Sequence, residues 1–250
     1  MDKPITVVVN TRNEGKNIAG CLSSIRNLTD KIIVVDMEST DGTVETAKKF
    51  GALVFNFPQK DYVEPARHFA ISKSKTDWVM VLDADEEITP ELAVEIKSLE
   101  DSCTHYKIPR KNVFGRTKWL RHGGWWPDYQ TRLINKSCLK SWPKRIHSTP
   151  IITGKIGHLD NPILHYFHGD LESMVKKTLV FEDIESGLLY KAKKTATTAT
   201  FFRKYFAELY RRLLKNLGFL DGTLGVMESI YQAFSKTITY LFVYEKSRNL

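Results

Sequence analysis

The sequence predicts an α/β fold in which a mostly parallel sheet carries helices on both faces, followed by a C-terminal helical extension. Three observations support this prediction. Short β-branched runs alternate with segments of helical periodicity over residues 1–100. Polar residues cluster after several of these runs, at the edge where open α/β sheets bind ligands. Apolar residues recur at helical spacing over residues 169–250.

The first hundred residues are expected to hold four strands with helices between them. Their apolar runs and polar breaks predict strands at Ile5–Val9, Ile32–Val35, Ala52–Phe57 and Trp78–Leu82. The helical spacing of apolar residues predicts helices at Ile18–Leu28, through Val44, Ala47 and Phe50, and at Glu64–Ser74. A further helix is expected from Pro90, because Thr89 is a suitable N-cap and proline fits the first helical position.

The charge of the chain predicts an anionic partner. The 250 residues carry a formal net charge of +8, whereas the hydrophobic and charged contents of 42% and 26% are ordinary for a globular protein. Nucleic acid, a phosphorylated sugar and an acidic membrane surface all fit this charge.

The cysteines and the hydropathy predict a reducing, cytoplasmic compartment. Cys21, Cys103 and Cys138 are widely separated and odd in number, which makes a disulfide framework unexpected. The sequence has neither a signal-peptide pattern at its start nor an apolar window of 18 or more residues.

The strand at Trp78–Leu82 runs directly into the carboxylates of Asp83 and Asp85. Side chains at the end of a buried strand meet at the ligand edge of the sheet, so these two could share a cation. Hard ions such as Mg²⁺ or Mn²⁺ take oxygen ligands and often combine one or two carboxylates with substrate phosphates. The alternative is that the acidic run only marks the start of a helix, where carboxylates are favourable. That alternative explains Glu87 and Glu91 but leaves Asp83 and Asp85 unexplained.

Three segments together resemble the successive signatures of family 2 glycosyltransferases, in the same order and at similar spacing. They are Asn10–Glu14, Val35–Thr43 and Leu82–Glu86. The resemblance implies the GT-A fold, a nucleotide-sugar donor and a divalent metal at the Asp-x-Asp motif. One departure is Met37-Glu38, which stands where many members have Asp-Gly or Ser-Gly.

The resemblance also assigns roles to single residues. Asp85 would bind the metal, and Asp83 would lie near the ribose and the metal, with Mg²⁺ or Mn²⁺ as the cofactor. The implied donor-binding residues are Thr11, Arg12, Glu14, Asp36, Arg67, Asp83, Ala84 and Asp85.

Residues 101–168 are interpreted as the acceptor-binding half, after a nucleotide-sugar-binding half at 1–100. From Ser102 to Leu159 the chain has twelve Lys or Arg residues and a single acidic one, Asp128. Arg and Lys suit phosphates and carboxylates, and aromatic faces suit sugar rings. Single-stranded nucleic acid is an alternative ligand for basic, aromatic surfaces, but no RNA-binding signature accompanies them.

Asp128 is the candidate catalytic base. It follows the loop His122–Pro127 and precedes an expected strand at Tyr129–Ile134. An inverting transferase needs a base beside the acceptor hydroxyl, although this carboxylate could instead pair with a basic neighbour. The loop resembles the Gly-Trp-Tyr-Pro-Asp segment of bacterial family 2 enzymes that build the lipopolysaccharide core, where the Asp is the expected base. Acceptor contacts are expected from Trp125, Trp126 and Arg132.

A histidine is a further metal ligand that the resemblance implies. Arg145–Ser148 is similar to a His-Glu segment of the same enzymes, which makes His147 the nearest match. His165 and His168 are rivals for this role.

The helical extension at 169–250 contains an amphipathic segment. A helix is expected at Leu171–Tyr190, and apolar doublets repeat every four residues between Phe201 and Leu217, with basic residues filling the remainder. Such a helix suits the surface of an anionic membrane. It could equally pack against the catalytic domain or a second subunit. A break is expected at Gly218–Gly222, followed by a helix in which Ile230–Tyr244 supplies another apolar face.

The resulting hypothesis is a metal-dependent, inverting transfer of one sugar, with UDP-glucose as the first donor to test. The acceptor would be an acidic or phosphorylated glycolipid of lipopolysaccharide or another cell-surface glycan, reached at the cytoplasmic face of the inner membrane. Two alternatives stay open. One is a nucleotidyltransferase acting on sugar phosphates, and the other is a non-catalytic glycan- or membrane-binding protein. Nucleic acid is the less favoured partner, and the C-terminal helices could support an oligomer.

Overall fold

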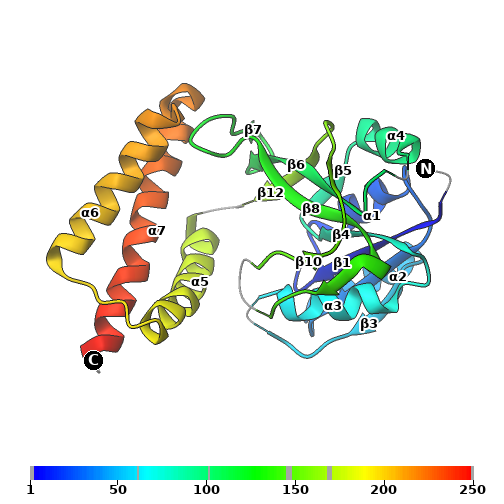
Figure 1. Cartoon of the computed structure of the whole chain (residues 1–250), viewed down its shortest axis with the longest axis horizontal. Coiled ribbons are helices and arrows are strands. Elements are labelled where there is room, and N and C mark those ends of the chain that lie inside the picture. The colour runs from blue at the N-terminus through cyan, green and yellow to red at the C-terminus, as the bar shows by residue number, and fades with distance from the viewer. Residues whose placement is uncertain (1–2, 61, 101, 145–147, 168–170, 249–250) are drawn as a thin grey trace. The chain divides into compact units, whose positions relative to one another are not determined.

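The computed structural model describes residues 3–60, 62–100, 102–144, 148–167 and 171–248 (Figure 1). The chain forms two compact units. The first comprises residues 1–111 and 129–166, and the second comprises residues 112–128 and 167–250. The second unit therefore combines the C-terminal helices with the loop that precedes Asp128.

The sheet of the first unit starts with parallel strands. They are β1 (Ile5–Thr11), β2 (Ile32–Asp36), β3 (Leu53–Asn56) and β4 (Trp78–Asp83). The order along the sheet is β3-β2-β1-β4-β8-β6-β12-β5, in which β8 (Asp128–Asn135) runs antiparallel to β4. The expected mostly parallel sheet is confirmed, and β1 and β4 extend two residues and one residue beyond their apolar runs.

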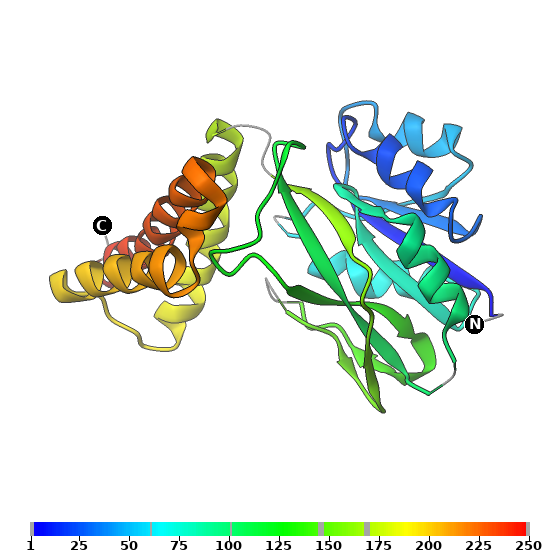
Figure 2. The same cartoon turned by 90° about the horizontal axis from the view of Figure 1, so that it is seen from above.

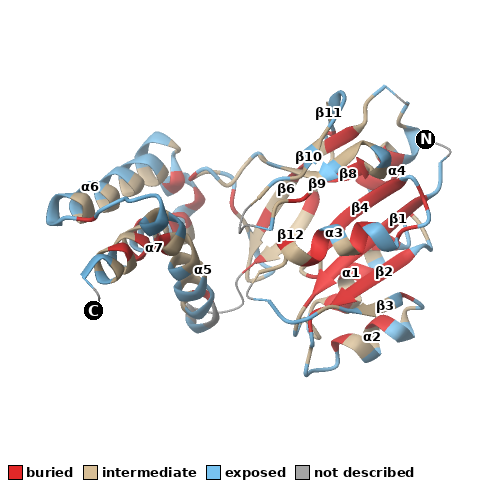
Figure 3. Ribbon diagram, turned by 60° about the horizontal axis from the view of Figure 1, so that its bottom comes forward, coloured by how far each residue is buried: buried red, intermediate tan, exposed pale blue. Residues whose placement is uncertain are grey.

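Helices cover both faces of this sheet, as expected (Figure 3). They are α1 (Ile18–Ile25), α2 (Thr43–Lys49), α3 (Glu64–Lys73) and α4 (Pro90–Ser98). In β1, Val7 and Val9 pack in the core with α1, α2 and α4, whereas Val8 packs in the core with α3. Successive strand side chains point to opposite faces, so a run without polar interruptions is the pattern of a strand buried on both sides.

The start of α4 confirms the expected cap. Thr89 Oγ1 accepts a hydrogen bond from the Leu92 backbone N–H at 3.2 Å, and Pro90 is the first helical residue. This helix begins after β5 (Glu86–Ile88), so the helix start and the Asp83–Asp85 strand end are separate features.

Most strands between residues 101 and 168 have no clear signal in the sequence. Beside β8 they are β6 (His105–Phe114), β7 (Lys118–Trp119), β9 (Leu139–Ser141), β10 (Ile151–Ile152), β11 (Ile156–His158) and β12 (Ile163–Phe167). Several span only two or three residues and mix exposed with half-buried positions. Neither alternation nor an apolar run marks such strands, since few of their side chains enter a core.

The second unit contains the expected helices (Figure 2). They are α5 (Leu171–Lys191), α6 (Thr198–Leu209) continued by the π-helix η2 (Tyr210–Lys215), the 3₁₀ turn η3 (Gly218–Asp221) and α7 (Gly222–Arg248). Thr197 caps α6 in a capping box with Thr200. The expected break is confirmed at η3, where Gly222 has a φ of 71°. The last helix begins directly after this turn, and Gly225, Glu228 and Ser229 are buried in its first turns.

The apolar doublets of α6 and η2 separate into an inner and an outer row. The outer row (Phe202, Phe206, Tyr210 and Leu214) is 52–62% exposed. The first members of the doublets are half-buried, and the Phe201 ring lies 6.1 Å from that of Tyr244 in α7. Half of the predicted stripe thus packs on α7 and half faces outward. Within the described ranges, no helix has the length and apolarity needed to cross a membrane.

Candidate functional site

The candidate site lies at the carboxyl ends of β1, β2 and β4. The strand register pairs Asn10 with Asp83 and Thr11 with Asp36, so the three sequence motifs meet at one edge. This is the edge at which open α/β sheets bind their ligands.

An ion-pair cluster holds Asp83 at the end of β4. Arg67 Nη2 lies 2.9 Å and 3.0 Å from the two Asp83 carboxylate oxygens. Arg132 Nη2 donates to Asp83 Oδ2 at 2.8 Å and to Glu86 Oε1 at 2.5 Å. Glu86 in turn accepts the Asp83 backbone N–H at 3.0 Å. The predicted donor residues Arg67 and Asp83 are therefore in direct contact.

The cluster keeps its members charged. Partial burial alone would raise the pKa of Asp83, but the positive charges of Arg67 and Arg132 outweigh it and hold that pKa well below its usual range. Burial alone would lower the pKa of Arg132, but Glu86 and Asp83 raise it above its ordinary value. Arg132 was predicted to contact the acceptor. Its guanidinium is 4% exposed and bonds two carboxylates, so its observed contacts orient Asp83, and an acceptor contact stays a prediction.

Asp85 has a different environment in the turn between β4 and β5. His165 Nε2, on β12, lies 3.6 Å from Asp85 Oδ2, and the Tyr166 backbone N–H donates to the Asp85 carbonyl at 2.9 Å. Between the two aspartates, Ala84 is 3% exposed and belongs to the core. The Asp-x-Asp motif therefore directs one carboxylate to arginines and the other to a histidine.

The donor atoms around Asp85 fit a divalent cation better than those around Asp83. Asp83 already accepts hydrogen bonds from two guanidiniums, whose positive charge opposes a cation there. Asp85 and His165 offer an oxygen and a nitrogen, and phosphates commonly complete such a coordination shell. Among the described residues, no group of three or more His, Cys, Asp or Glu side chains could hold a metal. His147 and His168 lie outside the described residues.

Polar atoms at the end of β1 have no hydrogen-bond partner within the described part of the chain. They are the amide nitrogen and oxygen of Asn10, Thr11 Oγ1 and Arg12 Nε. Asn10 and Thr11 are each 2% exposed. Because an unpaired buried polar group is costly, such groups at a ligand edge are available to hydrogen-bond a ligand. Thr11 and Arg12 were predicted donor contacts, and Asn10 is an addition.

The loops after β1 and β2 hold each other through side-chain bonds. Asp36 accepts the Ser39 backbone N–H at 2.9 Å, and Glu14 donates its backbone N–H to Thr43 Oγ1 at 2.9 Å. Glu38 has a φ of 59° in this turn, a left-handed conformation that glycine adopts more easily. The turn thus keeps its glycine-like shape with Glu38 in place of the residue that many family members have.

Asp128, the predicted base, is the first residue of β8. Its Oδ2 accepts a hydrogen bond from Asn112 Nδ2 at 3.2 Å, and Asn112 is fully buried. The predicted acceptor aromatics Trp125 and Trp126 are half-buried. The Trp125 ring lies 4.8 Å from Phe167, and the Trp126 ring lies 5.3 Å from Trp119.

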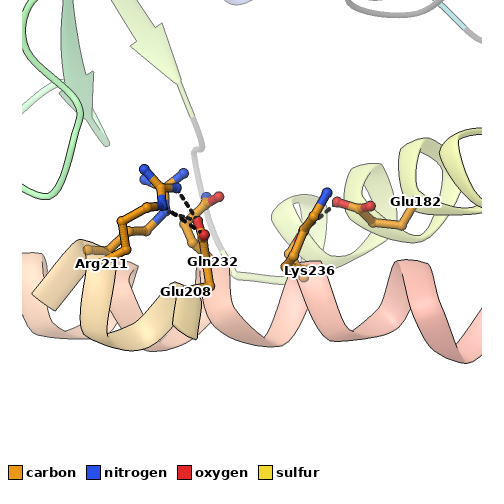
Figure 4. A pocket seen from close by; sticks show the side chains of 7 residues that line it. Glu182, Glu208, Arg211, Gln232 and Lys236 are labelled. Carbon is orange, nitrogen blue, oxygen red and sulfur yellow. Dashed lines mark hydrogen bonds and ion pairs between the residues drawn. The ribbon is translucent and has the colours of Figure 1, made fainter. Parts of the chain in front are cut away.

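A polar pocket of about 290 Å³ lies among the three long helices of the second unit (Figure 4). Its lining comprises Glu182, Glu208, Arg211, Arg212, Gln232, Ser235 and Lys236. Glu208 accepts from both arginines, and Glu182 accepts from Ser235 at 2.7 Å. Most of its charged groups are thus paired within the helices themselves.

Four residues of these sites escaped the sequence interpretation. Asn10 and Glu86 stand inside the quoted motifs, and their places at strand ends were the available signal. The contacts of Asn112 with Asp128, and of Arg110 with Glu86 at 3.5 Å, join distant positions, which no local pattern indicates.

The comparison with protein families gives one match. The model of glycosyl transferase family 2 matches residues 6–153. An uncharacterized glycosyltransferase of Rickettsia prowazekii is 32% identical over 258 residues, covering 94% of this chain and 84% of that protein. An uncharacterized glycosyltransferase of Rickettsia conorii is 30% identical, covering 99% of this chain and 92% of that protein.

Solved structures share the fold at low sequence identity. The mannosyltransferase PcManGT of Pyrobaculum calidifontis, solved with GDP-Man and Mn²⁺, has a TM-score of 0.55 at 16% identity, covering 100% of this chain and 83% of that one. Residues 1–349 of Staphylococcus aureus TarS, solved with UDP-GlcNAc, give a TM-score of 0.54 at 15% identity, covering 98% and 91%. The GT-A type of fold is thereby confirmed.

Proposed function

The chain belongs to glycosyl transferase family 2, and from this membership we propose that it transfers one hexose, with inversion, from a nucleotide-diphosphate sugar to an acidic glycan or glycolipid. UDP-glucose is the first donor to test. The acceptor pathway that we favour is lipopolysaccharide or another cell-surface glycan, because residues 102–159 combine twelve basic residues with one acidic residue.

The unpaired atoms at the end of β1 are the observation that supports donor binding most directly. Asn10, Thr11 and Arg12 offer polar atoms without partners among the described residues, beside the Asp36 end of β2. A nucleoside offers ring nitrogens, carbonyl oxygens and hydroxyls that would satisfy such atoms. Glu14 and Asp36 are assigned to the same pocket, as are Arg67 and Asp83, which are joined by two hydrogen bonds.

Asp85 and His165 are the residues that we assign to a bound Mg²⁺ or Mn²⁺. When bound, the ion supplies charge stabilisation to the departing diphosphate. Asp85 would hold the ion beside the donor phosphates. Arg67 and Arg132 would keep the Asp83 carboxylate ionised and in place.

Asp128 is assigned as the base that takes the proton of the acceptor hydroxyl as its oxygen attacks the anomeric carbon. Its carboxylate accepts from the buried amide of Asn112, which restricts its rotation. Trp125 and Trp126 are assigned to the acceptor, because aromatic faces suit sugar rings.

The outer row of α6 and η2 supports a second proposal, that this segment lies on an anionic membrane surface. Within residues 201–217 the chain has five basic residues and one acid, Glu208, which is already paired with two arginines. Arg203 and Lys215 are exposed alongside the outer row, so apolar and cationic groups share this surface.

Donor turnover tests the main proposal. UDP-glucose, UDP-GlcNAc and GDP-mannose would each be incubated with the protein and Mn²⁺, and release of the nucleoside diphosphate measured. We expect release from one donor, its loss with chelator, and its loss in Asp85→Ala. Asp30→Ala, which removes an exposed carboxylate, should behave as wild type.

Three results would argue against the proposal. Release that is unchanged in Asp85→Ala would remove the role of the Asp-x-Asp motif. Consumption of a nucleoside triphosphate with a sugar phosphate, and no donor turnover, would favour the nucleotidyltransferase alternative. Glycan binding without either reaction would favour a non-catalytic protein.

A further inference from the structure

We propose that Asp221, in the turn before α7, is a positioning residue for Asp128. It fixes the loop Arg121–Gly124, and this loop in turn fixes the amide that holds the Asp128 carboxylate. The inference rests on the proposed function, since it concerns the residue assigned as the base. It gives the C-terminal helices a part in the reaction.

Asp221 binds the start of the loop through three hydrogen bonds. Its Oδ2 accepts the backbone N–H groups of Arg121 and His122, each at 2.8 Å, and its Oδ1 lies 2.9 Å from His122 Nδ1. The Asp221 side chain is 4% exposed. Hydrogen bonds to a buried carboxylate are among the stronger ones in proteins, so this contact is a firm anchor.

A second anchor holds the next residue of the loop. Gly123 donates its N–H to the Asn216 carbonyl at 2.7 Å, and its own carbonyl accepts from Arg212 Nη1 at 3.1 Å. Glu208 holds the Arg212 guanidinium at 2.7 Å (Figure 4 shows Glu208 in the pocket wall). Gly123 has a φ of 67°, a left-handed conformation that glycine adopts without strain.

The fixed loop continues directly to the predicted base. The Trp125 carbonyl accepts from Asn112 Nδ2 at 3.2 Å, and the same nitrogen lies 3.2 Å from Asp128 Oδ2. Arg212 also stacks on Trp125, with its guanidinium carbon 5.3 Å from the ring centre. The Asn112 amide thus joins the loop backbone to the carboxylate. If Trp125 moves, the amide must turn, and the Asp128 carboxylate loses its fixed orientation.

Orientation of the base affects rate more than binding. A catalytic group must meet the substrate proton within hydrogen-bond distance and at the right angle, and small misplacements are costly. Loss of Asp221 should therefore lower kcat and leave donor affinity unchanged. A purely structural role would instead lower stability without a dependence on Asp128.

Hydrogen exchange tests the anchor without needing any activity. Asp221→Asn keeps the size of the side chain but removes its charge and one acceptor. We expect the amides of Arg121 and His122 to exchange roughly 10- to 100-fold faster, as befits the loss of bonds to a charged acceptor. Asp183→Asn is the matched control, because Asp183 pairs with Lys246 elsewhere in the helices. Unprotected amides in wild type, or unchanged protection in Asp221→Asn, would overturn the anchor.

Kinetics then test the link to the base. In Asp221→Asn we expect kcat for donor turnover to fall at least tenfold, with the affinity for UDP and Mn²⁺ unchanged. When Asp221→Asn is combined with Asp128→Asn, kcat should fall little further than in Asp128→Asn alone, because both substitutions affect the same step. Independent, multiplying effects would overturn the positioning role.

The two proposals fail in different ways. If wild type turns over no donor, the proposed function fails, and hydrogen exchange still decides the anchor. If Asp128→Asn is fully active, the assignment of the base fails, and with it the positioning role. Should Asp221→Asn not fold, Arg212→Lys tests the second anchor instead, because Arg212 Nη1 donates to the Gly123 carbonyl. We then expect faster exchange of the backbone amides of the loop Arg121–Gly124, and unchanged exchange would overturn the anchoring of this loop.

Discussion

Arg132 Nη2 lies 2.8 Å from Asp83 Oδ2 and also bonds Glu86, so that Arg132 joins β8 to the end of β4 and to the start of β5. Arg67 binds the other side of Asp83. Asp83 is 22% exposed in its side chain, while Glu86 and Arg132 are almost fully buried. Each buried charge here depends on its partners, because isolated charges are costly to bury.

Arg132→Met should therefore destabilise the protein strongly. The substitution leaves Glu86 buried with the longer Arg110 contact as its remaining cation among the described residues, beside the Asp83 backbone N–H, and removes one of the two cations at Asp83. We expect the free energy of unfolding to fall by about 3–5 kcal/mol, measured by denaturant titration. Arg26→Met is the control, since its pair with Asp30 is exposed and worth at most about 1 kcal/mol. Equal effects of the two substitutions would contradict this account.

Asp128→Asn should lower the rate of transfer without weakening donor binding. Asparagine has the same shape but cannot accept the proton, and loss of a positioned base typically costs about 10²–10⁴ in rate. The hydrogen bond from Asn112 can persist to the Asn oxygen. Rates come from donor turnover, and affinities from calorimetry with UDP and Mn²⁺. A folded variant with normal turnover would move the base elsewhere.

Glu228 in α7 predicts a pH-dependent contribution to stability. Burial raises the pKa of Glu228 to about 6, from an ordinary 4.5, and its Oε1 has no partner among the described residues. The folded protein thus binds this proton more tightly than the unfolded chain. The tighter binding contributes about 2 kcal/mol to the free energy of unfolding below pH 4.5. This contribution is lost as the pH rises through about 6.

Glu228→Gln should remove this dependence. The variant should become more stable than wild type above pH 6, by about the same 2 kcal/mol, and the difference should shrink toward pH 4.5. Denaturant titrations of both proteins at several pH values measure it. Because every other carboxylate is present in both proteins, the difference isolates Glu228. A difference that does not vary with pH would exclude this explanation.

The outer row predicts salt-sensitive binding to anionic vesicles. We expect the protein to sediment with vesicles that contain acidic lipid and to be released by salt, because exposed charge attraction is screened. Phe202→Ser with Phe206→Ser should weaken binding at least tenfold, since each ring loses its apolar contact. Arg203→Glu with Lys215→Glu should weaken it and reduce its salt dependence. Leu53→Ser, an exposed change on β3, is the control.

Sedimentation velocity separates the membrane from a second copy of the chain. Binding to vesicles by a monomer supports the membrane proposal. A dimer in solution that the Phe202 and Phe206 substitutions dissociate, with no vesicle binding, would assign the outer row to self-association instead.

The sequence by itself determined the fold of residues 1–100. Residues such as Val7, Val8 and Val9 form apolar runs because these strands are buried on both faces, and such burial leaves a clear local signal. The motif positions followed from the same signal, since polar residues at the ends of parallel strands meet at one edge.

Only the tertiary structure decided how the charged groups are partnered. Asp83 contacts arginines and Asp85 contacts His165, although only one residue separates the two aspartates. The reason is that Asp83 ends β4, whereas Asp85 lies in the turn that follows it. The tertiary structure also divides the apolar doublets of α6 into packed and exposed rows. Contacts such as that of Asp221 with Arg121 join positions far apart in the chain. These hydrogen bonds and ion pairs join residues that are far apart in the sequence, so no local pattern predicts them. Burial of a strand, in contrast, produces a run of apolar residues that are neighbours in the sequence.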